Sequence, residues 1–95
     1  MTYMLSPLTR TFFISNKKGL HARASAKFVQ TVNRFNAEVV VTRGEESVAG
    51  SSIMGLLTLA AAYKTSIQIS VCGPEAQACL EAISYLIESG FFEEL

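Results

Sequence analysis

The stretch Thr65-Ser66-Ile67-Gln68-Ile69-Ser70-Val71-Cys72 alternates between apolar and polar side chains. Successive side chains of a β-strand point to opposite faces, so residues 65–72 are predicted to form a strand with Ile67, Ile69 and Val71 on one face. Gly73-Pro74 breaks this strand, and Pro74 can occupy the first turn of a helix over residues 75–88. That helix carries apolar side chains at helical spacing, which predicts a buried face: Ala76, Cys79, Leu80, Ile83 and Ile87.

Elements of the same two kinds follow one another along the rest of the chain. Hydrophobic spacing predicts further strands over residues 8–15, 37–43 and 47–49, and helices over residues 22–35 and 53–62. Every predicted strand has one apolar and one polar face, as a sheet covered by helices on a single side requires. The sequence therefore predicts an α+β fold of order βαββαβα, a two-layer open-faced sandwich whose four-stranded antiparallel sheet is covered on one face by three helices. Residues 1–95 are expected to form one domain, with residues 1–6 as a flexible N-terminal extension.

Composition narrows the class of protein. A chain that is 49% hydrophobic and 17% charged is typical of soluble globular domains, and its apolar runs are too short to span a membrane. No basic segment followed by an apolar one opens the chain, so we expect a cytoplasmic protein that is not exported. The two cysteines, Cys72 and Cys79, favour reduced thiols over a disulfide. One histidine and two scattered cysteines match no metal-ligand spacing, so neither a metal nor another cofactor is expected.

Charge is distributed unevenly although the net charge is zero. Residues 1–37 contain six basic and no acidic side chains, whereas residues 38–95 contain eight glutamates and two basic side chains. Four of the six early charges lie within six residues of His21. A solvated basic helix would explain this distribution, but we favour a basic face that attracts a phosphate or an acidic partner.

The only histidine of the chain stands in Gly19-Leu20-His21-Ala22-Arg23, immediately before a predicted helix. Neutral imidazole is nucleophilic near pH 7, and the unpaired amides of Ala22 and Arg23 in the first helical turn point toward any group bonded to it. The Arg23 guanidinium can add charge-assisted hydrogen bonds to phosphate oxygens. This arrangement predicts that His21 carries a phosphoryl group. The alternative is that His21 only caps the helix or lies in a loop.

Other functions fit the sequence less well. A Ser-His-acid triad needs a carboxylate to orient the imidazole, and the glutamates begin only at position 38, which argues against one. Gly50-Ser51-Ser52 lacks the glycine spacing and the lysine of a phosphate-binding P-loop. Nucleic-acid binding is not expected, because the polar sheet faces carry no interleaved aromatic side chains and the charge sums to zero. We therefore expect a phosphoryl-transfer relay rather than a stand-alone enzyme.

These features together resemble the HPr phosphocarrier family of the phosphoenolpyruvate-dependent phosphotransferase system, over residues 8–90. The resemblance includes Gly-Leu-His-Ala-Arg before a helix and a serine that opens the middle helix, in Ser51-Ser52-Ile53-Met54-Gly55-Leu56. The ending Ser89-Gly90-Phe91-Phe92-Glu93-Glu94 is similar to the nitrogen-related branch, and His-Ala-Arg-Ala-Ser resembles regulatory versions of the system. The family usually has proline where this chain has Ala24. Alanine keeps the helix, so we expect transfer to survive.

The resemblance implies a function and its partners. An Enzyme I-type donor, charged from phosphoenolpyruvate, would phosphorylate His21, with assistance from Arg23, and His21 would pass the group to an EIIA-type acceptor. The alternative is a non-catalytic regulatory adaptor of the same fold, which binds partners whatever the state of His21. We expect a monomer that does not insert into a membrane.

Ser52 has two possible roles. As the N-cap of the middle helix, its hydroxyl accepts a hydrogen bond from a helix amide, which is worth about 1 kcal/mol. In many HPr proteins the matching serine is phosphorylated by a dedicated kinase, so an HPr serine kinase/phosphatase is a possible further partner. A phosphate there would act on docking rather than on the fold.

A docking surface is predicted beside His21. It combines the basic side chains of Lys18, Arg23 and Lys27 with an apolar patch formed by Ile53, Met54 and Leu57. The alternative is that the apolar patch covers a neighbouring helix.

Overall fold

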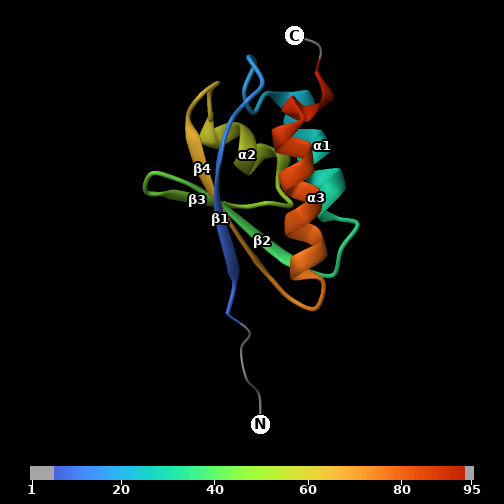
Figure 1. Ribbon diagram of the computed structural model, residues 1–95. Coiled ribbons are helices and arrows are strands. Elements are labelled where there is room, and N and C mark those ends of the chain that lie inside the picture. The colour runs from blue at the N-terminus through green and yellow to red at the C-terminus, as the bar shows by residue number, and fades with distance from the viewer. Residues whose placement is uncertain (1–5, 94–95) are drawn as a thin grey trace.

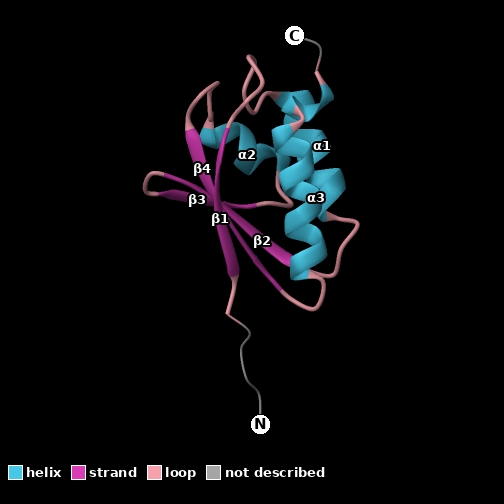
Figure 2. Cartoon of the chain, viewed as in Figure 1, coloured by secondary structure: helices cyan, strands magenta, loops and turns pink. Residues whose placement is uncertain are grey.

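The computed structural model describes residues 6–93 as a two-layer α+β fold (Figures 1 and 2). A four-stranded antiparallel sheet of order β1-β4-β2-β3 carries the helices on one face, which confirms the predicted fold class. The elements in chain order are β1 (Leu8–Phe13), α1 (Ala22–Val32), β2 (Glu38–Arg43), β3 (Glu46–Ala49), α2 (Ile53–Leu59), β4 (Ser66–Cys72), α3 (Ala76–Glu88) and a 3-10 turn, η1 (Gly90–Phe92).

The alternating stretch forms β4, which lies between β1 and β2 inside the sheet. Its predicted inner face is buried, at 1% exposure for Ile67 and 0% for Ile69 and Val71. Phe12 of β1 lies opposite Ile67, and Val41 of β2 lies opposite Ile69. The pairing therefore places apolar side chains of neighbouring strands on the same face.

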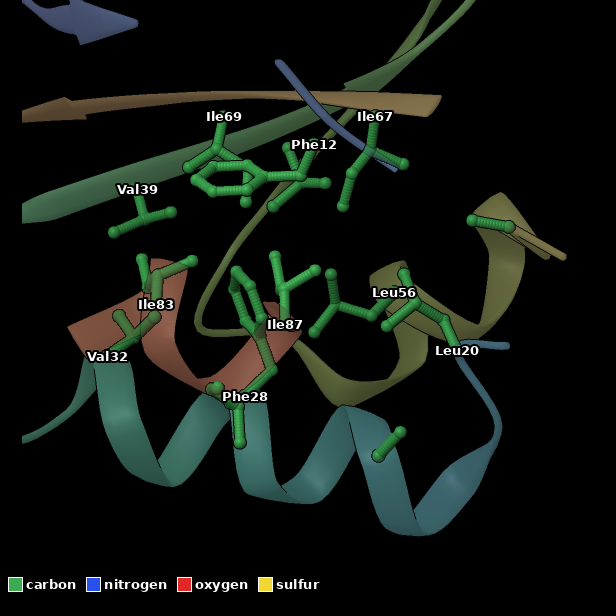
Figure 3. Packing of buried hydrophobic residues seen from close by; sticks show 14 of the residues in the cluster. Phe12, Leu20, Phe28, Val32, Val39, Leu56, Ile67, Ile69, Ile83 and Ile87 are labelled. Atoms are coloured by element: carbon green, nitrogen blue, oxygen red, sulfur yellow. The ribbon is translucent and has the colours of Figure 1, made fainter. Parts of the chain in front are cut away.

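The core fills the space between this face and the helices. Figure 3 shows Phe12, Ile67 and Ile69 of the sheet pointing toward Phe28 of α1 and Ile87 of α3. All five side chains are buried. Burial of apolar area at about 25 cal/mol per Å² is the main stabilising term, and it also fixes α1 over the sheet with its first turn at one end of the molecule.

Two helices end earlier than predicted. α1 ends at Val32 rather than at residue 35, because the amides of Arg34 and Phe35 bond three residues back and tighten the last turn. α2 ends at Leu59 rather than at residue 62, because Ala60 takes a left-handed conformation with φ of 50°. The remaining predicted boundaries move by one or two residues.

The predicted N-terminal extension, residues 1–6, lies outside the described residues apart from Ser6, which is exposed. None of the helices found between residues 6 and 93 is both long and apolar enough to cross a membrane.

Candidate functional site

The loop before α1 is fixed against the end of α2. Gly19 has a φ of +66°, and a Cβ at this position would lie 2.4 Å from the carbonyl oxygen of Ala61. Only glycine fits such a backbone without strain. The buried Leu20 donates its amide proton to the Ala61 carbonyl over 2.9 Å. Gly19 and Leu20 therefore fix the position of the next residue, His21.

His21 is the N-cap residue of α1. Its extended backbone lets its carbonyl accept the amide proton of Ser25 over 2.8 Å. Within the described residues its side chain makes no capping hydrogen bond, and 28% of that side chain is exposed. The imidazole is therefore not used to cap the helix, and the predicted amides of Ala22 and Arg23 lie at the helix start beside it.

The imidazole faces an open surface cavity of about 830 Å³. The fold brings His21 together with Arg23, Lys18 and Lys27 around this cavity, which also contains a carboxylate. Its lining residues are Asn16, Lys17, Lys18, His21, Ala22, Arg23, Lys27, Phe92 and Glu93. Four basic side chains at the mouth of a helix make this cavity suited to an anion. Between residues 6 and 93, no group of three or more His, Cys, Asp or Glu side chains is placed to hold a metal ion.

Glu93 is a site residue that the sequence did not reveal. Its Oε2 contacts Nε2 of His21, and its Oε1 accepts a hydrogen bond of 3.1 Å from Nδ2 of Asn16. The late position of the glutamates in the sequence is therefore no argument against a carboxylate beside the imidazole. Partial burial by itself raises the pKa of the Glu93 carboxyl, but hydrogen bonds from His21 and Asn16, with the charges of His21 and Lys18, hold that pKa below its ordinary value.

The residues before Glu93 are anchored rather than forming a loose tail. Phe91 is fully buried, and its carbonyl accepts a hydrogen bond of 2.6 Å from Nζ of Lys27. Figure 1 shows the C-terminal turn at the same end of the molecule as the first turn of α1. Lys27 therefore fixes the C-terminal turn beside His21 as well as adding charge to the cavity.

The second predicted motif opens α2. Oγ of Ser52 accepts the amide proton of Gly55 over 2.9 Å, which confirms its capping role. Met54 is 71% exposed and Ile53 is also exposed, whereas Leu57 is half-buried. The exposure of Met54 is inconsistent with the alternative in which all three apolar side chains cover a neighbouring helix.

Comparison with known proteins identifies the family. Residues 8–89 match the family model described as the PTS HPr component phosphorylation site. The chain belongs to the HPr family. It is 46% identical over 87 residues to the phosphocarrier protein HPr of Neisseria meningitidis serogroup A, covering 92% of this chain and 97% of that protein. It is 36% identical over 89 residues to the phosphocarrier protein NPr of Shewanella violacea, covering 94% and 98%.

A solved HPr structure agrees with this assignment. The crystal structure of HPr-C-His from Thermoanaerobacter tengcongensis superposes with a TM-score of 0.88 at 38% identity, covering 93% of this chain and 99% of that one. The family predicted from Gly-Leu-His-Ala-Arg and the serine of the middle helix is confirmed, and its relatives include an NPr protein.

Proposed function

We propose that this protein is a histidine phosphocarrier of the phosphotransferase system. His21 accepts a phosphoryl group from an Enzyme I-type donor that was charged from phosphoenolpyruvate, and it passes the group to an EIIA-type acceptor. The observation that carries the proposal is the His21 imidazole, which makes no capping bond within the described residues and faces an open cavity with four basic side chains. Membership in the HPr family supports the same reaction.

The transfer step uses one ring nitrogen of His21. Nε2 contacts the Glu93 carboxylate, so Nδ1 is the nitrogen whose lone pair remains for attack on phosphorus. As the new P–N bond forms, the bond between phosphorus and the donor breaks, and its electron pair stays with the donor. Arg23 and the amides of Ala22 and Arg23 then bind the phosphoryl oxygens.

The balance between holding and releasing the phosphoryl group follows from the surroundings of His21. A few amides and one guanidinium stabilise the phosphorylated form. The His21 side chain is nevertheless partly exposed, so an acceptor can reach the phosphoryl group. A deeper and more cationic cage would hold the group too tightly to pass it on. These properties suit a relay rather than an enzyme with its own substrate pocket.

Donor and acceptor must both reach His21, so they use the same surface. We propose that the surface comprises Lys18, Arg23 and Lys27, which steer the encounter, and Ile53, Met54 and Leu57, which hold the complex briefly. In this proposal the protein acts in the cytoplasm. It acts as a monomer, because a second copy bound stably on this surface would cover His21. The acceptor belongs to a regulatory, nitrogen-related branch of the system.

Ser52 adds a level of control in this proposal. It lies at the edge of the docking surface, next to Ile53 and Met54. An HPr serine kinase/phosphatase would add or remove a phosphate there. The phosphate would repel an acidic partner. It would not unfold α2, because a negative charge at a helix N-terminus is locally favourable.

Incubation with phosphoenolpyruvate and the cognate Enzyme I-type protein tests the proposal. Peptide mapping should place acid-labile phosphate on the peptide that contains His21. His21→Ala should abolish this phosphate, while circular dichroism should show that the fold is kept. Lys64→Ala, which removes an exposed charge outside the cavity, is the control and should be phosphorylated normally. A His21→Ala protein that keeps full function while carrying no phosphate would instead indicate the regulatory adaptor.

A further inference from the structure

The His21–Glu93 pair joins two ends of the fold that are 72 residues apart in sequence. Glu93 is held on its other side by Asn16, whose side chain is fully buried. Nδ2 of Asn16 donates both to Oε1 of Glu93 over 3.1 Å and to the carbonyl of Gly19 over 2.8 Å. The carboxylate that faces His21 is thus tied to the same loop that positions His21.

We propose that Glu93 is a positioning residue, which holds His21 in the tautomer with its proton on Nε2 and its lone pair on Nδ1. The proposal rests on the proposed function, because it concerns the nucleophile of that reaction. A neutral imidazole carries one proton and can place it on either nitrogen. An ionised carboxylate only accepts hydrogen bonds, so its contact with Nε2 selects the form with the proton on Nε2.

Two further contacts hold the Glu93 carboxylate in place beside Nε2 of His21. Asn16 donates to Oε1 of Glu93, which favours the ionised form of the carboxyl, and an ionised carboxylate has no proton to donate to Nε2. Burial of Phe91 and the Lys27 bond to its carbonyl fix the backbone two residues earlier. Glu93 is therefore presented to Nε2 as an ionised acceptor of set position.

The same geometry assists the transfer itself. Glu93 lies on the Nε2 side of the ring, away from the nitrogen that attacks phosphorus. When Nδ1 forms the P–N bond and the donor keeps the electrons of the broken bond, the proton stays on Nε2 and the ring becomes positively charged. The carboxylate stabilises this charge through the existing hydrogen bond, and the reverse step restores the neutral ring.

The opposite expectation has a clear physical basis. A carboxylate beside the cavity could simply repel the incoming phosphoryl group, which is also negative. The lysines and Arg23 on the other sides of the cavity counter this repulsion. If repulsion dominated, loss of the carboxylate would speed transfer, whereas the positioning role requires that it slow transfer.

The tautomer can be measured directly by ¹⁵N NMR of the imidazole in the unphosphorylated protein, at a pH above 7. Wild type should show the proton on Nε2. Glu93→Gln should show a mixture, because an amide can accept from or donate to the ring. Glu88→Gln is the matched control, since it removes the same charge from an exposed glutamate at the end of α3 and should leave the tautomer unchanged.

Phosphoryl transfer gives the second measurement. Glu93→Gln should accept phosphate from the Enzyme I-type donor about 10-fold or more slowly than wild type, because the carboxylate that fixes the tautomer is lost. Glu93→Asp should recover part of the rate. Glu88→Gln should match wild type. A wild-type proton mainly on Nδ1, or a Glu93→Gln protein that reacts as fast as wild type or faster, overturns the proposal.

Failure of this proposal is distinguishable from failure of the proposed function. If His21→Ala loses its acid-labile phosphate and Glu93→Gln changes neither tautomer nor rate, only the role of Glu93 is wrong. If His21→Ala keeps its acid-labile phosphate, the function is wrong. In that case the role of Glu93 in transfer is overturned with it.

Discussion

Leu20 and Ala61 are joined by a backbone hydrogen bond of 2.9 Å, which fastens the loop carrying His21 to the chain just after α2. The left-handed turn at Ala60 directs the Ala61 carbonyl toward this loop. The position of His21 thus depends on residues 40 positions away in sequence. Mutations at this junction are expected to affect both stability and transfer.

Gly19→Ala should be strongly destabilising. Both Gly19 and Gly44 have a positive φ, but only at Gly19 would a Cβ collide with backbone. At Gly44, no described atom beyond the two adjacent residues would lie within 4 Å of the Cβ. Gly44→Ala should reduce the free energy of unfolding by about 1–2 kcal/mol from backbone strain alone. Gly19→Ala should reduce it by about 2–4 kcal/mol, because the clash adds to the strain. Denaturant unfolding of both variants checks this. Equal losses in the free energy of unfolding would mean that the backbone around Gly19 shifts enough to accommodate the added Cβ.

Ser52→Asp should slow phosphorylation of His21 at low salt while Tm stays close to that of wild type. Aspartate caps a helix about as well as serine, but it adds a negative charge at the edge of the docking surface. Ser52→Asn is the matched control, because it caps without charge and should transfer at the wild-type rate. Raising the salt concentration should slow wild type and narrow its difference from Ser52→Asp. Equal rates for the two variants at low salt would mean that Ser52 does not lie at the edge of the docking surface.

Met54→Glu should weaken the transient complex with the donor and raise the KM for transfer. Met54 is 71% exposed and lies in the apolar patch of the proposed docking surface. Phe13→Glu is the control, since Phe13 is 68% exposed on β1, outside that patch. Steady-state kinetics at several carrier concentrations should separate the two. A Met54→Glu protein with wild-type kinetics, together with an unaffected Ser52→Asp protein, would place the docking surface elsewhere.

The Glu93 carboxyl should make stability depend on pH. Its pKa is lowered in the folded protein, chiefly because hydrogen bonds from His21 and Asn16 outweigh the opposing effect of burial. A carboxyl whose pKa is lowered by folding stabilises the protein at any pH above its pKa in the unfolded state, which is about 4.3. This stability is lost as the pH falls through the pKa of the folded state. Wild type should therefore unfold at higher denaturant than Glu93→Gln at pH 7, and the difference should vanish in acid. A difference that is constant with pH would mean that the ionised carboxylate is not the stabilising form.

The sequence predicted the parts of the fold that depend on local pattern. Alternation at Ile67, Ile69 and Val71 marked the central strand, because side-chain direction in a strand is set by neighbouring residues. The end of α2 was missed because an alanine in a left-handed conformation, Ala60, has no sequence signature. Tertiary contacts override helix propensity there.

The part of the candidate site whose residues lie close together in the sequence was also predictable. His21, Arg23 and Lys18 could be placed together because they share one loop and one helical turn. Glu93 could not, because its position depends on burial of Phe91 and on a lysine bond from α1, both set by long-range packing. The pattern of residues 89–94 carried a family resemblance but no information on where the turn docks.

Relay by purified phosphoprotein tests the central claim most directly. The protein is phosphorylated with the Enzyme I-type donor, separated from it, and mixed with an EIIA-type acceptor. Wild type should transfer its phosphoryl group to the acceptor in a single turnover, with loss of phosphate from the His21 peptide. A His21→Ala protein that still relays phosphate to the acceptor would contradict the account.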